Sequence, residues 1–294
     1  MGLTAGQKMT LQVARETPFG HFLSNGNEDV LLHKKEQTRE LQIGDQVEVF
    51  LYTDHQGRLA ATMAMPIIGM GTYNWVEVVE VHRKYGVFVS VGIAKDLLVS
   101  RDDLPESYDE WPIRGDRLYC TMKVDKKGRL FADMATFEVM DTVSHQATEA
   151  DSNRNIEGTV YKLAEEGAHI ITDEGFLGYN HLSERKGVLR IGERVKGRII
   201  VVKEDGRVNL SLLGRSHEMM DQDAEAIYDY IKGRGAGMPY WDKTPADLIL
   251  ARFDMSKAAF KRGLGRLMKE GKVYQEEGWT YLSEHKEPGP SKKE

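Results

Sequence analysis

The sequence predicts a multidomain, mainly β protein in which three small five-stranded barrels precede a C-terminal α+β domain. Three observations lead to this fold class. One short glycine motif occurs three times, short segments with strand periodicity surround each copy, and the apolar period changes to that of a helix after residue 215.

The repeated motif is a glycine followed by an acidic residue, with a second glycine 13 or 14 residues later. The first steps of the three copies are Gly44-Asp45, Gly115-Asp116 and Gly192-Glu193. The second glycines are Gly57, Gly128 and Gly206, which gives offsets of 13, 13 and 14 residues (57 − 44, 128 − 115, 206 − 192). Successive copies start 71 and 77 residues apart (115 − 44, 192 − 115), so the chain contains three similar units of small-domain size.

The first unit contains five short segments with the alternation of apolar and polar residues that is typical of strands. These segments are 8–14, 19–23, 29–33, 47–52 and 59–63. A sheet of five such short strands buries one face completely only if it curls on itself. The first unit is therefore predicted to form a small closed barrel.

The second and third units repeat this arrangement. Their strands are expected at 75–81, 85–89, 97–99, 117–124 and 130–134, and then at 156–161, 167–171, 176–181, 195–202 and 208–212. Each second strand carries a glycine (Gly20, Gly86 and Gly167), and a residue without a side chain lets a strand bend at a barrel corner. The polar segment 136–155 is predicted to be a linker.

The C-terminal part has helical periodicity and then a hairpin. Met220, Ala224, Ile227, Tyr228 and Ile231 fall on one helix face, which Gly233 ends. Further helices are expected to start at Thr244-Pro245 and at Ser256, the latter running to about Glu270 before Gly271, and 273–275 and 279–282 form a hairpin. This is the layout of a winged helix. The predicted boundaries are 1–66, 70–140 and 152–214 for the barrels, 218–285 for the winged helix and 286–294 for a disordered tail.

Composition limits the possible functions. The formal net charge is −6 and no region carries an excess of Lys and Arg, so nucleic-acid affinity must come from local stripes and stacking aromatics. The chain lacks both a membrane-length apolar run and a signal pattern, which predicts a cytoplasmic protein with no membrane partner. The single cysteine, Cys120, excludes an intrachain disulfide and is expected to be buried.

The repeats resemble S1 domains, which are OB-type RNA-binding barrels. The likeness lies in the aromatic-Gly-x-aromatic second strands Phe19–Phe22 and Tyr85–Phe88, in the Gly-acid steps, and in the ending Arg207-Val208-Asn209-Leu210-Ser211. Three such barrels and a winged helix, over residues 1 to about 285, resemble the conserved virulence factor B family. The resemblance implies RNA binding linked to control of gene expression, without a catalytic centre.

The resemblance also implies which residues bind RNA: aromatics on the second strand, a histidine ending the third strand, and a nearby arginine. An exposed ring stacks on any base and contributes about 1–3 kcal/mol per base. The matching residues are Phe19, Phe22, His33 and Arg58 in the first barrel, Tyr85, Phe88 and Arg129 in the second, and Tyr179, His181 and Arg207 in the third. Ser100 replaces the histidine in the second barrel, and Glu166 and His169 replace the aromatics in the third.

Each of these assignments has a structural alternative. Phe22 and Phe88 share a face with Gly20 and Gly86, and if that face points inward the rings are core residues. For the two strand-end histidines, His33 and His181, the alternative is a local hydrogen bond.

The expected third helix of the winged helix carries the clearest charge pattern. Phe260, Leu264, Leu267 and Met268 are predicted to share the buried face, opposite the cations Arg262, Arg266 and Lys269 and with Lys261 on the flank. A recognition helix requires such a packed back and basic front. The alternative is an ordinary solvated face.

No enzymatic motif is present in the sequence: it contains no Cys/His cluster for a metal and no phosphate-binding glycine loop of the Walker type. We therefore expect a non-enzymatic protein without metal or cofactor, whose barrels bind single-stranded RNA and whose winged helix offers a second contact for duplex nucleic acid. The alternatives are a DNA-binding transcription regulator acting through the winged helix and a protein–protein scaffold.

Overall fold

The computed structural model describes residues 2–214, 216–235 and 237–285. The chain divides into two compact units, Met1–Leu213 and Gly214–Glu294. The predicted tail 286–294 and the side chain of Met220 lie outside the described residues.

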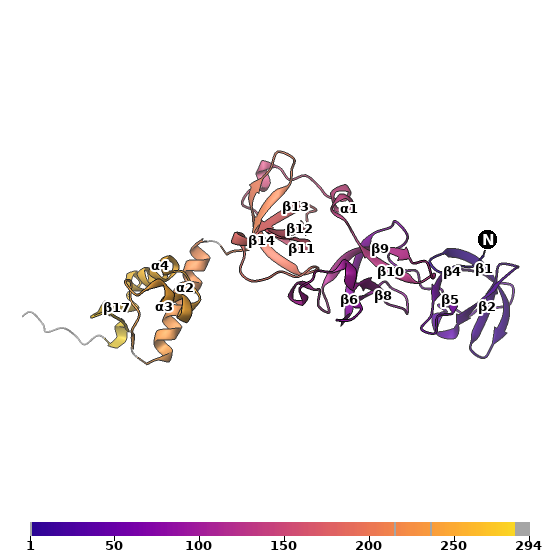
Figure 1. The fold of residues 1–294 in the computed structure, drawn as a ribbon, viewed down its shortest axis with the longest axis horizontal. Coiled ribbons are helices and arrows are strands. Elements are labelled where there is room, and N and C mark those ends of the chain that lie inside the picture. Colours follow the sequence, from indigo (N-terminus) through magenta and orange to yellow (C-terminus); the bar gives the residue numbers. More distant parts are fainter. Residues whose placement is uncertain (1, 215, 236, 286–294) are drawn as a thin grey trace, which may run out of the picture. The chain divides into compact units, whose positions relative to one another are not determined.

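The first unit consists of three closed five-stranded barrels with the same strand order, in which the fifth strand lies between the third and the fourth (Figure 1). The predicted fold class is therefore confirmed. The first barrel comprises β1 (Lys8–Thr17), β2 (Gly20–Ser24), β3 (Asp29–His33), β4 (Gln46–Thr53) and β5 (Leu59–Thr62). The second comprises β6 (Asn74–His82), β7 (Gly86–Ser90), β8 (Leu97–Ser100), β9 (Arg117–Val124) and β10 (Leu130–Met134). The third comprises β11 (Asn155–Ala164), β12 (Gly167–Thr172), β13 (Leu177–His181), β14 (Arg194–Val202) and β15 (Val208–Ser211).

The Gly-acid step of each copy closes its barrel. In the first barrel, the Gly44 N–H donates to the Val13 carbonyl and the Val13 N–H donates to the Asp45 carbonyl, both at 2.8 Å. The Asp45 carboxylate accepts from the Gln42 N–H at 3.0 Å, which fixes the turn before β4. Gly44 has φ +98°, which L side chains rarely adopt. We call this pair of backbone bonds the closing clamp.

The closing clamp recurs in the other two barrels. Gly115 and Asp116 bond the two backbone groups of Val78, and Gly192 and Glu193 bond those of Val160. Immediately after the clamped valine, the first strand has a β-bulge, where its register to the second strand shifts by one residue. A bulge bends and twists a strand, as a small barrel requires.

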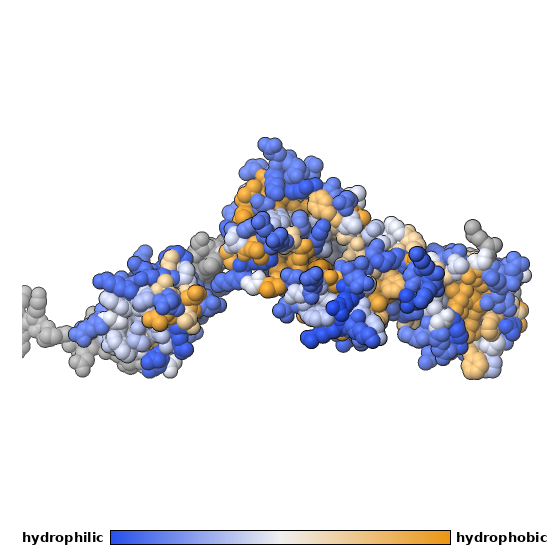
Figure 2. Space-filling view, viewed as in Figure 1, coloured by the Kyte–Doolittle hydropathy of each residue, from blue (hydrophilic) through white to orange (hydrophobic). Residues whose placement is uncertain are grey.

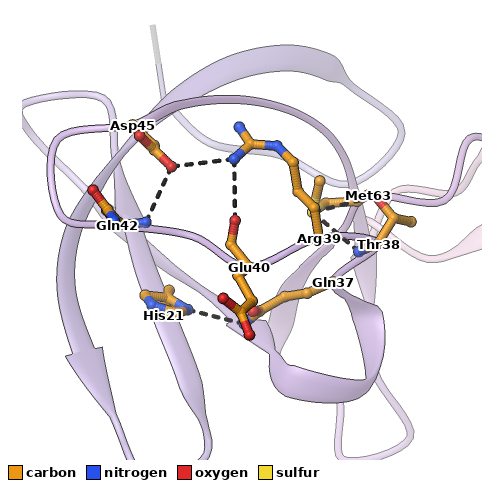
Figure 3. Close-up of polar contacts among 8 residues, drawn as sticks. All are labelled: His21, Gln37, Thr38, Arg39, Glu40, Gln42, Asp45 and Met63. Carbon is orange, nitrogen blue, oxygen red and sulfur yellow. Dashed lines mark hydrogen bonds and ion pairs between the residues drawn. The ribbon is translucent and has the colours of Figure 1, made fainter.

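Polar contacts hold the β3–β4 connection of the first barrel against its wall (Figure 3). Arg39 Nη1 donates to Asp45 Oδ2 at 3.2 Å and to the Glu40 carbonyl at 3.2 Å. Gln37 Nε2 lies 3.0 Å from Nδ1 of the buried His21. The connection is thereby tied to both β2 and the closing clamp.

The glycine at the start of each second strand permits a close approach to the third strand. At Gly20 (φ +149°) a Cβ would collide with the Leu32 carbonyl, and at Gly86 (φ +130°) it would collide with the Val99 carbonyl. Backbone contact as well as bending therefore explains why these positions are glycine.

The barrels of the first unit share apolar packing. The core of the second barrel includes Phe50 and Tyr52 of the first barrel and Ile191 of the third. Arg190 Nε also contacts Asp116 Oδ2 at 3.3 Å, which joins the third barrel to the closing clamp of the second.

The segment 136–155, predicted as a linker, is folded. It contains helix α1 (Phe137–Thr142), and Met140 is buried against Tyr161, Ile171 and Leu177 of the third barrel. Polar composition led to the linker prediction, but Phe137 and Met140 of the short helix pack against the third barrel, and the His145 and Ala147 N–H groups donate to the Gly175 and Gly206 carbonyls. Short 3₁₀ helices complete the secondary structure: η1 (Lys34–Glu36), η2 (Arg101–Asp103), η3 (Tyr108–Glu110), η4 (Glu149–Asp151), η5 (Leu182–Glu184) and η6 (Ser283–His285).

The second unit is the predicted winged helix. It contains α2 (Ser216–Gly233), α3 (Ala246–Phe253), α4 (Lys257–Lys269) and a sheet with strand order β16 (Gly237–Met238), β18 (Trp279–Leu282), β17 (Val273–Glu276). Ser256 caps α4 by accepting from the Ala259 N–H at 3.2 Å.

Two glycines of α4 have different surroundings. Gly263 is buried against α2, and a Cβ there would lie 3.1 Å from the Ala224 nitrogen and 3.0 Å from Ile227 Cδ1. Gly265 faces open space. The close approach that Gly263 permits is thus to a helix of its own domain.

The predicted apolar face of α4 is wrong at one position. Phe260, Leu264 and Leu267 are buried, but Met268 is 44% exposed. Because the helix turns about 100° per residue, Met268 points about 100° away from Leu267 and lies outside the contact with α2.

We predict that Gly265→Ala raises the local stability of α4 by about 0.5–1 kcal/mol, because alanine restricts the unfolded backbone more than glycine does. Gly263→Ala gains less, because its Cβ presses on α2. Amide hydrogen exchange of α4 in the full-length chain measures both effects. Equal slowing of exchange in the two variants would contradict the packing argument.

Candidate nucleic-acid interface

One row of outward side chains crosses each barrel on four adjacent strands, directly after the bulge. We call it the cross-strand row. The first row is Arg15, Phe22, Leu31 and Ala60; the second is Glu80, Phe88, Leu98 and Phe131; the third is Lys162, His169, Tyr179 and Asn209. Figure 2 shows hydrophobic residues among hydrophilic ones on the visible face of the barrels.

In the first barrel, Phe22 points outward because its neighbours His21 and Leu23 fill the interior. The Arg15 guanidinium lies 4.0 Å from the centre of the Phe22 ring. Phe19, at the turn before β2, is 67% exposed. An aromatic ring can stack on a nucleobase, and a neighbouring cation can contact its phosphate, so this pair of side chains suits a nucleotide.

In the second barrel, Phe88 likewise points outward between the buried Val87 and Val89. Tyr85 is 49% exposed, and its ring stacks on His82 with 4.6 Å between the ring centres. The outward orientation that the sequence left open is therefore the one observed for both Phe22 and Phe88.

Arg58 and Arg129 are held by aspartates of their own turns. Arg58 donates from Nε and Nη2 to Asp54 Oδ2 at 2.9 and 2.7 Å. Arg129 contacts Asp125 Oδ2 from Nε at 2.8 Å and from Nη2 at 2.7 Å. The Arg129 backbone amide and then its guanidinium lower the pKa of Asp125. Each arginine therefore forms an ion pair with an aspartate, and the pair adds little net positive charge to the surface.

The residues that end the third strands make the local hydrogen bond that was the alternative prediction. His33 Nδ1 accepts from the Lys35 N–H at 3.2 Å, and His181 Nδ1 accepts from the Ser183 N–H at 3.1 Å. Ser100 does the same for the Asp102 N–H at 3.3 Å, which explains why serine can replace histidine. Both histidines are exposed, with Nε2 outside this bond.

In the third barrel, aromatic side chains surround a cavity of about 240 Å³. Its lining includes Phe137 of α1, Tyr161, His169 and Tyr179. The His169 ring lies 5.3 Å from that of Tyr179 and 5.9 Å from those of Phe137 and Tyr161. We call this space the aromatic cavity.

The cations beside the aromatic cavity differ from those of the other barrels. Lys203 stands where the first two barrels have Asp54 and Asp125. Arg207 contacts Asp141 of α1 at 3.1 Å and Asp205 at 3.7 Å, and its guanidinium lies 4.8 Å from the Phe137 ring centre.

In the winged helix, the four predicted cations fall into two groups. Lys261, Arg262 and Lys269 are exposed and make no ion pair within the described part of the chain. Arg266 instead donates to Glu270 at 2.8 Å. The hairpin turn adds two exposed acids, Glu276 and Glu277.

Sequence reasoning missed several residues of these surfaces. Arg15, Phe131 and Lys162 belong to the cross-strand rows, while Phe137 and Lys203 line the aromatic cavity. Two signals in the sequence point to some of these residues. The alternation of β10 turns Phe131 outward, and Lys203 stands where the other two barrels have an aspartate. Nothing in the sequence alone brings Phe137 to the third barrel.

Residues 2–214, 216–235 and 237–285 contain no group of three His, Cys, Asp or Glu side chains placed to hold a metal. None of the helices described is both long enough and apolar enough to span a membrane.

Family models match every part of this architecture. A model described as S1 domain matches residues 5–64, and one described as CvfB first S1-like domain matches 73–133. The model of the virulence regulatory factor CvfB, second domain, matches 140–214, and that of the CvfB-like winged helix domain matches 225–282.

Whole-chain relatives agree with the models. The uncharacterized protein YitL of Bacillus subtilis is 51% identical over 276 residues, covering 94% of this chain and 93% of that protein. Conserved virulence factor B of Staphylococcus saprophyticus is 34% identical over 260 residues, 87% of each chain. A crystal structure of a multidomain protein with nucleic acid binding domains from Streptococcus pneumoniae is 34% identical, covers 95% of this chain and 98% of that one, and aligns with a TM-score of 0.65. The sequence, the three barrels and the winged helix together place this chain in the conserved virulence factor B family.

Proposed function

We propose that this chain is a non-enzymatic, cytoplasmic RNA-binding protein that holds single-stranded RNA on the cross-strand rows and thereby influences gene expression. The observation that carries the proposal is the outward Phe22 and Phe88 at equivalent positions of two adjacent barrels. A ring on an outer strand surface stacks on a base without regard to sequence.

Charge supports a stacking mode of binding over a purely electrostatic one. The chain has a net charge of −6, and Arg58 and Arg129 are neutralised by their turn aspartates. Few phosphates can then be contacted, so affinity should fall only moderately as salt rises. Arg15 lies over the Phe22 ring and 3.7 Å from Asp29 Oδ2, a longer ion pair than the 2.7 Å pairs of Arg58 and Arg129, so of these three arginines it is the one best placed to meet a phosphate next to a stacked base.

The family supports the same class of function. The matched models are S1-like and winged-helix domains, neither of which is an enzyme family, and the pneumococcal relative is described as having nucleic acid binding domains. The relatives named conserved virulence factor B and the model named virulence regulatory factor support a role in regulation.

A second candidate function is duplex nucleic-acid binding by the winged helix, either beside RNA binding or as a DNA-binding regulator. Lys261, Arg262 and Lys269 favour it, since they are exposed cations on one helix. The acids Glu276 and Glu277 at the hairpin turn oppose it, because a wing that approaches DNA meets phosphates.

We predict that Phe22→Ala and Phe88→Ala each weaken the binding of single-stranded RNA by about 5- to 150-fold, the loss of about 1–3 kcal/mol of stacking. Fluorescence anisotropy of a labelled RNA with the full-length chain measures this, and circular dichroism checks folding. Trp279→Ala is the matched control, because Trp279 is an exposed ring outside the barrels. Unchanged affinity in both barrel variants would refute the proposal.

We further predict that the double variant Lys261→Glu, Arg262→Glu keeps its affinity for single-stranded RNA within about twofold, since neither cation belongs to the cross-strand rows that are proposed to contact the RNA. The same titration with duplex DNA tests the second candidate. DNA binding by the parent chain that disappears in this variant, while RNA binding is absent from both, would favour the regulator over the RNA-binding protein. Binding of neither nucleic acid would favour the scaffold.

A further inference from the structure

A groove of about 680 Å³ lies between the second and third barrels. This volume is within the ~300–1,000 Å³ of pockets that hold drug-sized ligands. The second barrel, with the two residues that follow it, contributes 103–106, 110 and 133–136 to the lining, and the third barrel contributes 161–165 and 191. Of these residues, Tyr161 alone also lines the aromatic cavity, so the two sites are separate. We call this space the interbarrel groove.

Part of the lining of the interbarrel groove is apolar. Leu104, Met134 and Leu163 are partly buried against the core of the second barrel, although Leu163 belongs to the third. Ile191, which also lines the groove, is 7% exposed and packs in the same core. The groove therefore offers apolar contacts to a ligand at the joint between two barrels.

Hydrogen bonds hold the walls of the groove in place. The indole N–H of the buried Trp111 donates to the Pro105 carbonyl at 2.7 Å, which fixes the segment after η2. The Ile191 N–H donates to the Glu110 carbonyl at 3.0 Å, which joins the third barrel to the second beside the groove. A groove formed in advance loses little conformational entropy when a ligand binds.

Carboxylates outnumber cations in the lining. Five acidic residues stand against one lysine, Lys162, which leaves a formal charge of −4 (1 − 5). Asp133 occupies the position of Thr62 in the first barrel and Ser211 in the third, so part of this charge is particular to the second barrel. The acidic residues are Asp103, Glu106, Glu110, Asp133 and Glu165.

Two of the five acids are already balanced by a cation. Lys123 Nζ lies 3.2 Å from Asp103 Oδ2 and 2.6 Å from Asp133 Oδ1. The three glutamates make no ion pair with any residue that the structure describes. Glu106 belongs to the second barrel and Glu165 to the third, and both are exposed. The groove thus has uncompensated carboxylates on both walls.

This combination of groups matches the side chains of lysine and arginine. Their aliphatic stems pack on apolar surface while their charged heads reach a carboxylate. The same carboxylates repel phosphates, which argues against RNA or DNA as the occupant. Because the carboxylates lie on both walls, a ligand that satisfies them carries several cations along one chain, as a basic peptide does.

We propose that the interbarrel groove binds a segment of another protein in which lysine or arginine residues alternate with apolar ones. The apolar side chains contact Met134 and Leu163, and the cations contact the three unpaired glutamates. Basic arms of this kind are typical of proteins that bind nucleic acids. Lys162 belongs to both the groove and the third cross-strand row, so the partner lies next to the proposed RNA surface. The proposal itself does not depend on RNA binding.

The test is fluorescence anisotropy of a labelled short peptide, in which lysine alternates with leucine, titrated with the full-length chain. Two further peptides carry glutamate in place of lysine or serine in place of leucine. We expect the lysine–leucine peptide to bind, the serine peptide to bind more weakly and the glutamate peptide not to bind. The double variant Glu106→Lys, Glu165→Lys should weaken the lysine–leucine peptide by about tenfold or more, because like charges then meet across the interface.

A matched variant separates the groove from the overall charge of the chain. Glu276→Lys, Glu277→Lys changes the net charge by the same amount, but it lies at the hairpin turn of the winged helix and should leave peptide binding nearly unchanged. Circular dichroism checks that both variants fold. An equal loss in both variants, or no binding of the lysine–leucine peptide to the parent chain, overturns the proposal. Spermidine that binds as tightly as the peptide overturns the assignment to a protein segment.

Discussion

The closing clamp is the interaction on which the rest of each barrel depends. It fixes the start of the fourth strand to the valine before the bulge of the first strand, for example Gly44 and Asp45 to Val13. A slip of one residue in a strand exchanges its two faces. The clamp and bulge therefore decide that Phe22 faces outward and Leu23 inward, which makes the candidate binding surface a consequence of barrel closure.

The three barrels share this frame but differ in what they place on it. The first two carry a phenylalanine in the row and an arginine held by a turn aspartate. The third has His169 and Tyr179 in the row, and Lys203 replaces the aspartate. The three barrels therefore share one backbone arrangement but differ in the surface they present. The first two have an open surface with an outward phenylalanine, and the third has the aromatic cavity.

The sequence was sufficient to predict most of the fold, because strand alternation and turn glycines are local signals. It was insufficient for the direction of Phe22, since the polar His21 occupies the interior beside Gln37 and breaks the expected polarity pattern. It also missed Phe137, whose role depends on docking a short helix far from the residues it contacts. Met268 was misplaced because periodicity gives a helix face but not the width of its contact.

Asp116 shows that the second barrel is not an interchangeable module. Its carboxylate accepts from the Ile113 N–H within its own turn at 2.9 Å and also from Arg190 of the third barrel at 3.3 Å. The carboxylate that stabilises the closing turn of the second barrel therefore also binds the third barrel. Tandem duplication can supply copies of a barrel. A copy moved to another place in the array would lack the contact between Asp116 and Arg190, so this contact depends on the order of the domains.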